Sequence, residues 1–115
     1  MKLNHLNLTV TNTVETQTFL AKYFDLKPMG KGNVKMAFLR DENGMVLSIF
    51  SHGTSPPEYP PGFHIGFIQE TEEKVNELNL RLRSDGFNVP EPSRQHGSWT
   101  FYFTAPGGFT IEVLC

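Results

Sequence analysis

Hydrophobic and polar residues alternate at the start of the chain. Residues 3–10 place an apolar set and a polar set on opposite sides of an extended backbone, and His5 falls in the polar set. A period of two is typical of a β-strand with one face buried. We therefore predict that the chain opens with a strand in which His5 lies on the exposed side.

The period then changes to that of a helix. Apolar residues recur at helical spacing between about residues 13 and 24, and Asn12 precedes Glu15 by three positions, as in a capping box. Alternation returns over residues 34–40 and 45–51, which the turn sequence DENG joins. These patterns predict a helix followed by a β-hairpin.

The same order recurs in the second half of the chain. A segment with four prolines, HGTSPPEYPPG, is unsuited to a helix or an interior strand and is expected to be a connector. After it we predict a strand at GFHIGFI, a helix within residues 70–86 that ends at Gly86, and strands at WTFYFT and FTIEVL joined by APGG.

The two halves also align residue by residue. NGMVLSIF (43–50) matches GGFTIEVL (107–114) without gaps and pairs Ser48 with Glu112, while the opening strands pair His5 with His64. Each copy is too small to bury its own sheet. The sequence thus predicts an α+β fold in one domain over residues 1–115, with module 1 at about 1–52, the connector at 53–62 and module 2 at about 63–115.

Composition narrows the class of function. The chain of 115 residues has 38% hydrophobic residues and a net charge of -2, with its Lys and Arg scattered. No apolar run approaches the roughly 20 residues of a membrane-spanning helix, and no basic patch suggests nucleic acid. We expect no nucleic-acid or membrane partner, and a small molecule instead. The lone Cys115 and the absence of a secretion signal at the start predict a cytoplasmic protein.

The repeat suggests where chemistry resides. If a pseudo-twofold axis relates the halves, His5, His64, Glu112 and Ser48 form one set, and three of them are good metal ligands that leave coordination positions open. A single strand His is more often structural or exposed, and a single Glu is more often a surface charge. The equivalence of the two histidines favours the metal site.

These residues carry a resemblance to a known family. LNHLNLTV, FHIGF and FYFTAPGGFTIEVL resemble the vicinal oxygen chelate superfamily, also called the glyoxalase, bleomycin-resistance and dioxygenase superfamily. The resemblance implies two βαβββ modules with curved mixed sheets around a central cavity. It also implies one divalent metal per site, Fe(II), Mn(II), Ni(II) or Zn(II), held by His5, His64 and Glu112, in a homodimer whose sites are shared between chains.

Departures from the family patterns bear on the reaction. Ser48 stands where glyoxalase I has a further Glu, which disfavours that isomerisation. Thr100 and Tyr102 match residues of the fosfomycin-resistance thiol transferases, but Pro92 replaces their phosphonate-binding Lys, for which Arg94 could substitute.

The extradiol dioxygenases offer a third comparison. They have a Tyr ten residues before the Glu ligand, as Tyr102 precedes Glu112, and they need an acid–base His, for which His96 in the PSRQHGSW loop or His52 is a candidate. A two-residue turn at PG would place Phe101 opposite Glu112, whereas one bulge residue would bring Tyr102 there. Both registers remain open from the sequence.

We therefore expect a metal-dependent lyase, thiol transferase or dioxygenase. Beyond the three ligands, the expected catalytic residues are Tyr102, Thr100 and His96, and the expected substrate contacts are Asn7, Ser48 and Arg94. The alternative is a metal-free binding protein that sequesters a drug, as bleomycin-resistance proteins do. A ferredoxin-like regulatory domain is a third reading of the strand–helix repeat.

Overall fold

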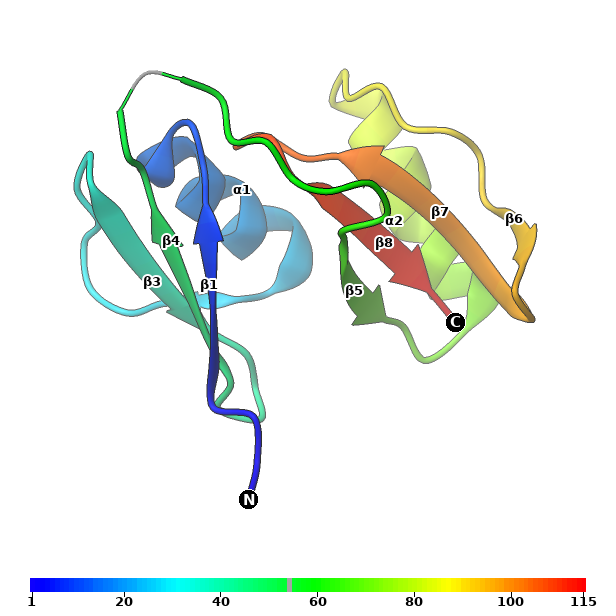
Figure 1. Cartoon of the computed structure of the whole chain (residues 1–115). Helices are drawn as coiled ribbons and strands as arrows, with labels where there is room; N and C mark the ends of the chain where they lie inside the picture. Colours follow the sequence, from blue (N-terminus) through cyan, green and yellow to red (C-terminus); the bar gives the residue numbers. More distant parts are fainter. Residues whose placement is uncertain (54) are drawn as a thin grey trace. The chain divides into compact units, whose positions relative to one another are not determined.

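The computed structural model describes residues 1–53 and 55–115 (Figure 1). Residue 54, inside the predicted connector, lies outside the described residues. The chain forms two compact units, one of residues 1–59 with 106–109 and one of residues 60–105 with 110–115. Each unit contains a mixed four-stranded sheet and a helix, which confirms the predicted α+β class.

The first unit has its opening strand beside its last. Its elements are β1 (His5–Thr9), α1 (Thr13–Phe24), β2 (Lys27–Pro28), β3 (Met36–Arg40) and β4 (Val46–Phe50). The strand order is β1-β4-β3-β2, and β1 runs parallel to β4 while the other pairs are antiparallel.

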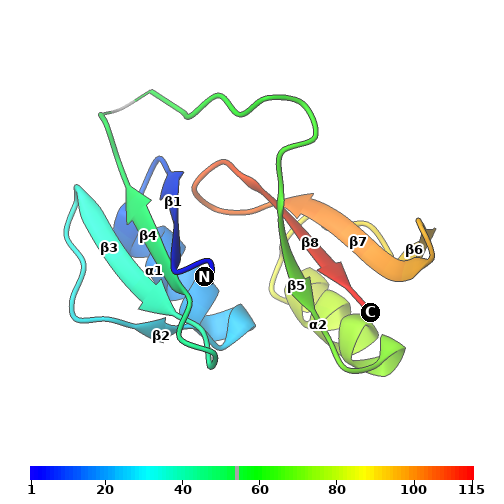
Figure 2. The same ribbon diagram turned by 60° about the horizontal axis from the view of Figure 1, so that its bottom comes forward.

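The second unit repeats this plan. Its elements are β5 (Ile65–Ile68), α2 (Glu72–Ser84), β6 (Ser93–Gln95), β7 (Ser98–Thr104) and β8 (Thr110–Leu114). The order β5-β8-β7-β6, with β5 parallel to β8, matches the first sheet strand for strand (Figure 2). The predicted internal repeat is confirmed.

Capping side chains fix where both helices begin. The Asn12 side chain accepts a hydrogen bond from the backbone N–H of Glu15 at 2.9 Å, and Thr71 accepts one from Lys74 at 3.2 Å. These bonds satisfy N–H groups that have no partner within the first helical turn. The helix predicted at about residues 13–24 is confirmed at both ends.

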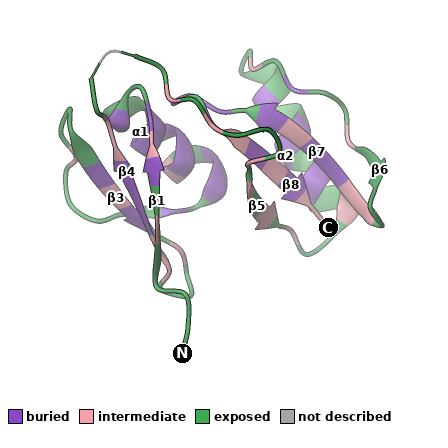
Figure 3. Cartoon of the chain, viewed as in Figure 1, coloured by how far each residue is buried: buried purple, intermediate pink, exposed green. Residues whose placement is uncertain are grey.

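Each helix covers one face of its own sheet. α1 packs on β3 and β4, and α2 packs on β7 and β8. Apolar residues of the helices and of the covered sheet faces are almost fully buried (Figure 3), and among them are Leu8, Leu20, Leu39, Ile49, Val75, Leu82, Phe101, Ile111 and Val113. Burial of one such side chain contributes about 1.5–3 kcal/mol. Because strand side chains alternate, polar residues of the central strands such as Ser48 and Glu112 point to the face away from the helix.

Two segments differ from the sequence-based prediction. The strand predicted at GFHIGFI begins only at Ile65, so His64 stands just before it. The segment 92–99 is not a plain loop, because it contains β6 and a two-residue turn at His96 and Gly97. Both turn residues have positive φ, 52° and 83°, as the right-handed twist of a tight hairpin requires.

Neither α1 nor α2 is long and apolar enough to cross a bilayer, considering the residues that the structure describes.

The turn at residues 106–109 belongs to the first unit through its backbone. The backbone N–H of Thr11 donates to the carbonyl of Gly107 at 3.1 Å, and Thr16 Oγ1 lies 3.3 Å from the carbonyl of Pro106. Gly107 has a φ of 108°, and a Cβ there would lie 2.5 Å from Thr16 Oγ1. Only glycine fits this close approach.

Replacement of Gly107 by Ala should therefore lower the free energy of unfolding by about 2–4 kcal/mol, because backbone strain and a steric clash add. Gly44→Ala is the matched control, since Gly44 also has a positive φ of 85° but open space around its Cβ. It should cost only about 1–2 kcal/mol. Urea denaturation of both variants measures the difference, and equal losses would contradict the proposed clash.

Candidate functional site

Glu112 lies in the middle of the second sheet, on the face away from α2. It pairs with Gly66 of β5 on one side and with Tyr102 of β7 on the other. The connection between β7 and β8 spans residues 105–109, an odd number, and so has the same effect on register as the bulge considered from the sequence. Tyr102 therefore faces the same side as Glu112, and Phe101 points into the core.

Three side chains surround the carboxylate of Glu112. Thr100 donates its hydroxyl to Oε1 at 2.9 Å, and Nε2 of His64 lies 3.3 Å from Oε2. The Tyr102 hydroxyl also hydrogen-bonds to Glu112, and its ring meets that of His64 edge-on at 5.3 Å. The Glu112 side chain is 13% exposed and that of His64 is 39% exposed, so the cluster opens to solvent on the histidine side.

The second ring nitrogen of His64 is held by the end of the proline-rich connector. Nδ1 lies 2.9 Å from the carbonyl of Gly62, and since a carbonyl can only accept, Nδ1 carries a proton. A turn with a Phe63 N–H to Pro60 bond of 3.1 Å presents this carbonyl, and Gly62 has the positive φ of 83° that a type II turn needs. Gly62 was missed from the sequence, although the motif PPGF is a recognisable type II signal.

The spacing of the His64–Glu112 pair suits a shared cation. Two ligands about 2.0–2.2 Å from one ion, at tetrahedral or octahedral angles, lie about 3.0–3.5 Å apart. The Nδ1–carbonyl bond and the Thr100 hydroxyl supply the outer contacts that orient metal ligands in proteins. Of the described residues, no three His, Cys, Asp or Glu side chains come together. The structure thus unites two of the three predicted ligands, and His5 belongs to the first unit.

The first sheet carries a neutral counterpart of this cluster. The row Asn7, Ser48 and Phe38 has the register positions of Gly66, Glu112 and Tyr102. Asn7 donates its amide to Ser48 Oγ at 2.8 Å, so Ser48 is buried but satisfied. His5 precedes Asn7 by two residues, as His64 precedes Gly66, and its Nδ1 lies 3.1 Å from Oδ1 of Asn4.

Arg94 does not join the Glu112 cluster. It pairs with Trp99, holds its guanidinium 5.4 Å from that ring, and forms an ion pair with Glu72 of α2. Trp99 in turn donates to Asn76 of α2 at 2.8 Å. Arg94 therefore lies on the helix-covered face of the sheet, opposite to Glu112, and the expectation that it could capture a substrate anion beside the cluster is not supported.

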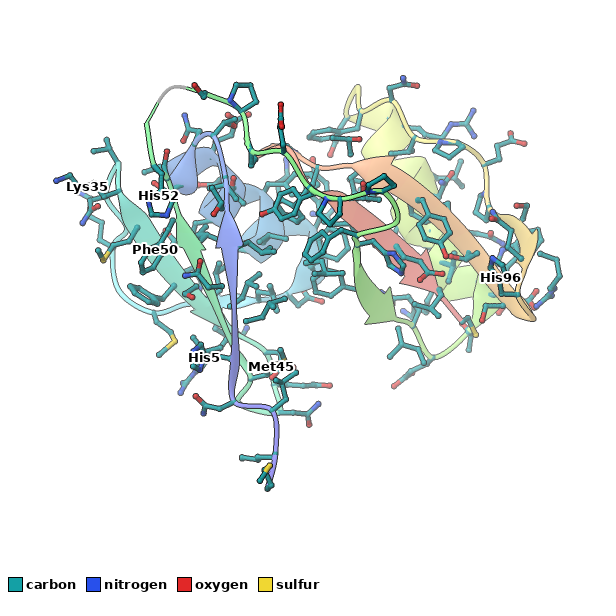
Figure 4. The ribbon with its side chains drawn as sticks, viewed as in Figure 1. His5, Lys35, Met45, Phe50, His52 and His96 are labelled. Carbon is teal, nitrogen blue, oxygen red and sulfur yellow. The ribbon has the colours of Figure 1, made fainter. Side chains whose placement is uncertain are left out.

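His96 and His52 also lie elsewhere in their units. His96 is exposed at the turn between β6 and β7, at the end of β7 away from Tyr102 (Figure 4). His52 lines a hollow of about 630 Å³ in the first unit, beside the start of α1 and together with Lys35. None of the predicted metal ligands lines that hollow.

The Tyr102–Glu112 bond has a measurable consequence at high pH. The bond to the carboxylate, then burial, raises the pKa of Tyr102 above its ordinary value, because ionisation would bring two negative charges together. The contribution of this bond to the free energy of unfolding is complete below the ordinary tyrosine pKa of about 10. It is lost as the pH rises through the higher pKa that Tyr102 has in the folded protein.

Glu112→Gln should lower the pKa of Tyr102 in metal-stripped protein, since the repelling charge is gone. Phenolate absorbance during an alkaline titration measures it, with Tyr102→Phe identifying the signal. An unchanged titration in Glu112→Gln would show that the hydroxyl does not bond to Glu112.

Comparison with known proteins identifies the family. A family model described as Glyoxalase/Bleomycin resistance protein/Dioxygenase superfamily matches residues 2–113. A possible glyoxalase from Bacillus cereus is 46% identical and has a TM-score of 0.91, with 100% of this chain and 99% of that chain covered. A search of curated proteins found no match.

More distant structures share the fold. A fosfomycin resistance protein from Listeria monocytogenes is 23% identical with a TM-score of 0.79, covering 99% of this chain and 90% of that one. A lactoylglutathione lyase from Agrobacterium tumefaciens is 18% identical with a TM-score of 0.77, covering 98% and 92%. The family match over nearly the whole length, together with the repeated sheet topology, leads to one conclusion: the chain belongs to the glyoxalase/bleomycin resistance protein/dioxygenase superfamily.

Proposed function

We propose that this protein is a metal-dependent enzyme that acts on a small molecule. The observation that carries the proposal is the His64–Glu112 pair, with Nε2 and Oε2 3.3 Å apart and both side chains oriented by further hydrogen bonds. A bound divalent cation would polarise substrate oxygens or activate dioxygen. His64, Glu112 and His5 are the proposed ligands.

The remaining side chains of the cluster have separate proposed roles. Thr100 is fully buried and fixes the orientation of the Glu112 carboxylate. Tyr102 keeps its proton at neutral pH, and when its hydroxyl turns away from Glu112 it donates that single proton to a substrate oxygen. Asn7 and Ser48 offer uncharged hydrogen-bonding groups to the substrate. Among lyase, thiol transferase and dioxygenase chemistry, the missing carboxylate at Ser48 argues against the glyoxalase I reaction.

We further propose that His5 comes from a second copy of the chain. His64 and Glu112 form a ligand pair within one unit, and the described residues supply no third metal-ligating side chain beside them. A symmetric dimer would place two equivalent copies of each ligand at two equivalent sites.

Metal content tests the first proposal. Purified protein equilibrated with a mixture of divalent metals should hold about one ion per chain, and His64→Ala should hold none, because His64 supplies the directed lone pair. Thr100→Val should lower the affinity by about 10–100-fold, the usual effect of losing an outer contact to a ligand. His96→Ala is the control and should bind metal normally.

Elemental analysis after removal of loose ions measures all four proteins. Metal retained by His64→Ala at the wild-type level would refute the site. No metal in the wild type would favour the alternative, a metal-free binding protein.

Mixing variants tests the shared site. His5→Ala and His64→Ala should each lose metal. When the two variants are unfolded and refolded together, about half of the dimers should be mixed, and each mixed dimer should have one intact site of two. The metal content should therefore return to about a quarter of the wild-type value. Elemental analysis and sedimentation measure content and size. A mixture without metal, or a monomeric wild type, would contradict sharing between chains.

A further inference from the structure

The face of the first sheet away from α1 carries a row of residues that includes two cations, Arg40 and Lys27. His5 pairs with Val46, Val46 pairs with Arg40, and Arg40 pairs with Lys27. Paired residues on neighbouring strands point to the same side of a sheet. One row across all four strands therefore presents a histidine, an arginine and a lysine on the face that no helix of this unit covers.

Beside this row lies an aromatic surface. Phe38 precedes Arg40 by two residues on β3 and shares its face, and the Phe38 ring meets that of Phe50 edge-on at 6.1 Å. The alternate residues of β3, Ala37 and Leu39, are buried toward α1, which fixes the direction of Phe38 and Arg40. Figure 4 labels two members of this face, His5 on β1 and Phe50 at the end of β4.

Among the described residues, no acidic side chain forms an ion pair with the cations of this row, Arg40 and Lys27. The nearest carboxylate along the chain, that of Asp41, is engaged as acceptor from the backbone N–H groups of Asn43 and Met45. The face therefore combines unpaired positive charge with the half-buried rings of Phe38 and Phe50, and both complement a planar organic anion.

We propose that this face binds an aromatic carboxylate, with the carboxylate on Arg40 and the ring against Phe38. Phe38 and Arg40 are two residues apart on the same face of β3, so their Cβ atoms lie about 7 Å apart. This distance is about the length of a small aromatic acid. The guanidinium fork matches a carboxylate in bidentate fashion, and aromatic rings gain from edge-on or offset contact. The inference rests on the proposed function in one respect: the bound acid is a substrate only if the protein is the metal-dependent enzyme proposed above.

Two other observations favour this position. Arg94, the other candidate for anion binding, is occupied by Glu72 and Trp99 on the covered face of the second sheet. Arg40 shares its row with His5, a proposed metal ligand, so an acid held by Arg40 lies on the same face as that ligand.

The test uses the metal-stripped full chain, so that the acid cannot bind through a metal. Naphthoate is the probe, and naphthylmethanol is its neutral analogue of similar shape. Arg40→Gln should weaken naphthoate binding by about tenfold or more, the usual cost of losing hydrogen bonds to a charged group. It should leave naphthylmethanol unaffected, whereas Phe38→Ala should weaken both ligands.

Arg94→Gln is the matched control, because it removes the same charge from the helix-covered face of the second sheet, whereas Arg40 lies on the open face of the first. It should leave naphthoate binding unchanged. Titration calorimetry measures the affinities, and circular dichroism confirms that each variant is folded. No saturable binding of naphthoate to the wild type, equal losses in the two arginine variants, or binding insensitive to Arg40→Gln would each overturn the inference.

These outcomes separate the inference from the metal proposal. Metal binding lost in His64→Ala, with naphthoate binding insensitive to Arg40→Gln, refutes only the substrate class. Arg40-dependent naphthoate binding by a wild type that holds no metal supports the acid site and refutes the proposed enzyme.

Discussion

The parallel pairing of the first and last strand in each unit is the constraint on which the site depends. Hairpins form between neighbours in sequence, but a parallel pair needs a crossover, here the helix and the strands that follow it. The pairing inserts β8 between β5 and β7 and thereby sets Glu112 between Gly66 and Tyr102. Without it, His64, just before β5, would not lie beside a residue almost fifty positions later.

Helical cover on one face only determines what the other face can do. The covered faces bury large apolar residues such as Leu39, Ile49, Phe101 and Ile111, so the open faces are free to carry polar groups at little cost to stability. The two units use that freedom differently. The second sheet gathers a hydroxyl, a phenol and an imidazole around Glu112, while the first offers the neutral Asn7–Ser48 bond, two phenylalanines and the Arg40 row.

Local signals made most of the fold predictable, and non-local packing decided the rest. Capping residues such as Asn12 fix helix ends within a few positions, and the gapless repeat correctly placed Ser48 and Glu112 at equivalent points of two sheets. The face of Arg94 could not be predicted, because it depends on β6, a strand too short to show a period. The direction of Tyr102 depends on whether the following loop is odd or even in length, which glycine content alone does not reveal.

The charge of the proposed metal site has a consequence for its ligand. Glu112 is mostly buried. Its burial costs less because Thr100 and Tyr102 form hydrogen bonds with its carboxylate, and because the His64 imidazole lies where both side chains can bind one cation. At the equivalent position Ser48 brings no charge and is satisfied by Asn7 alone. One carboxylate and two neutral imidazoles would leave a divalent cation with one net positive charge. Such a site attracts an anionic oxygen ligand, and the positive row at Arg40 has the same preference.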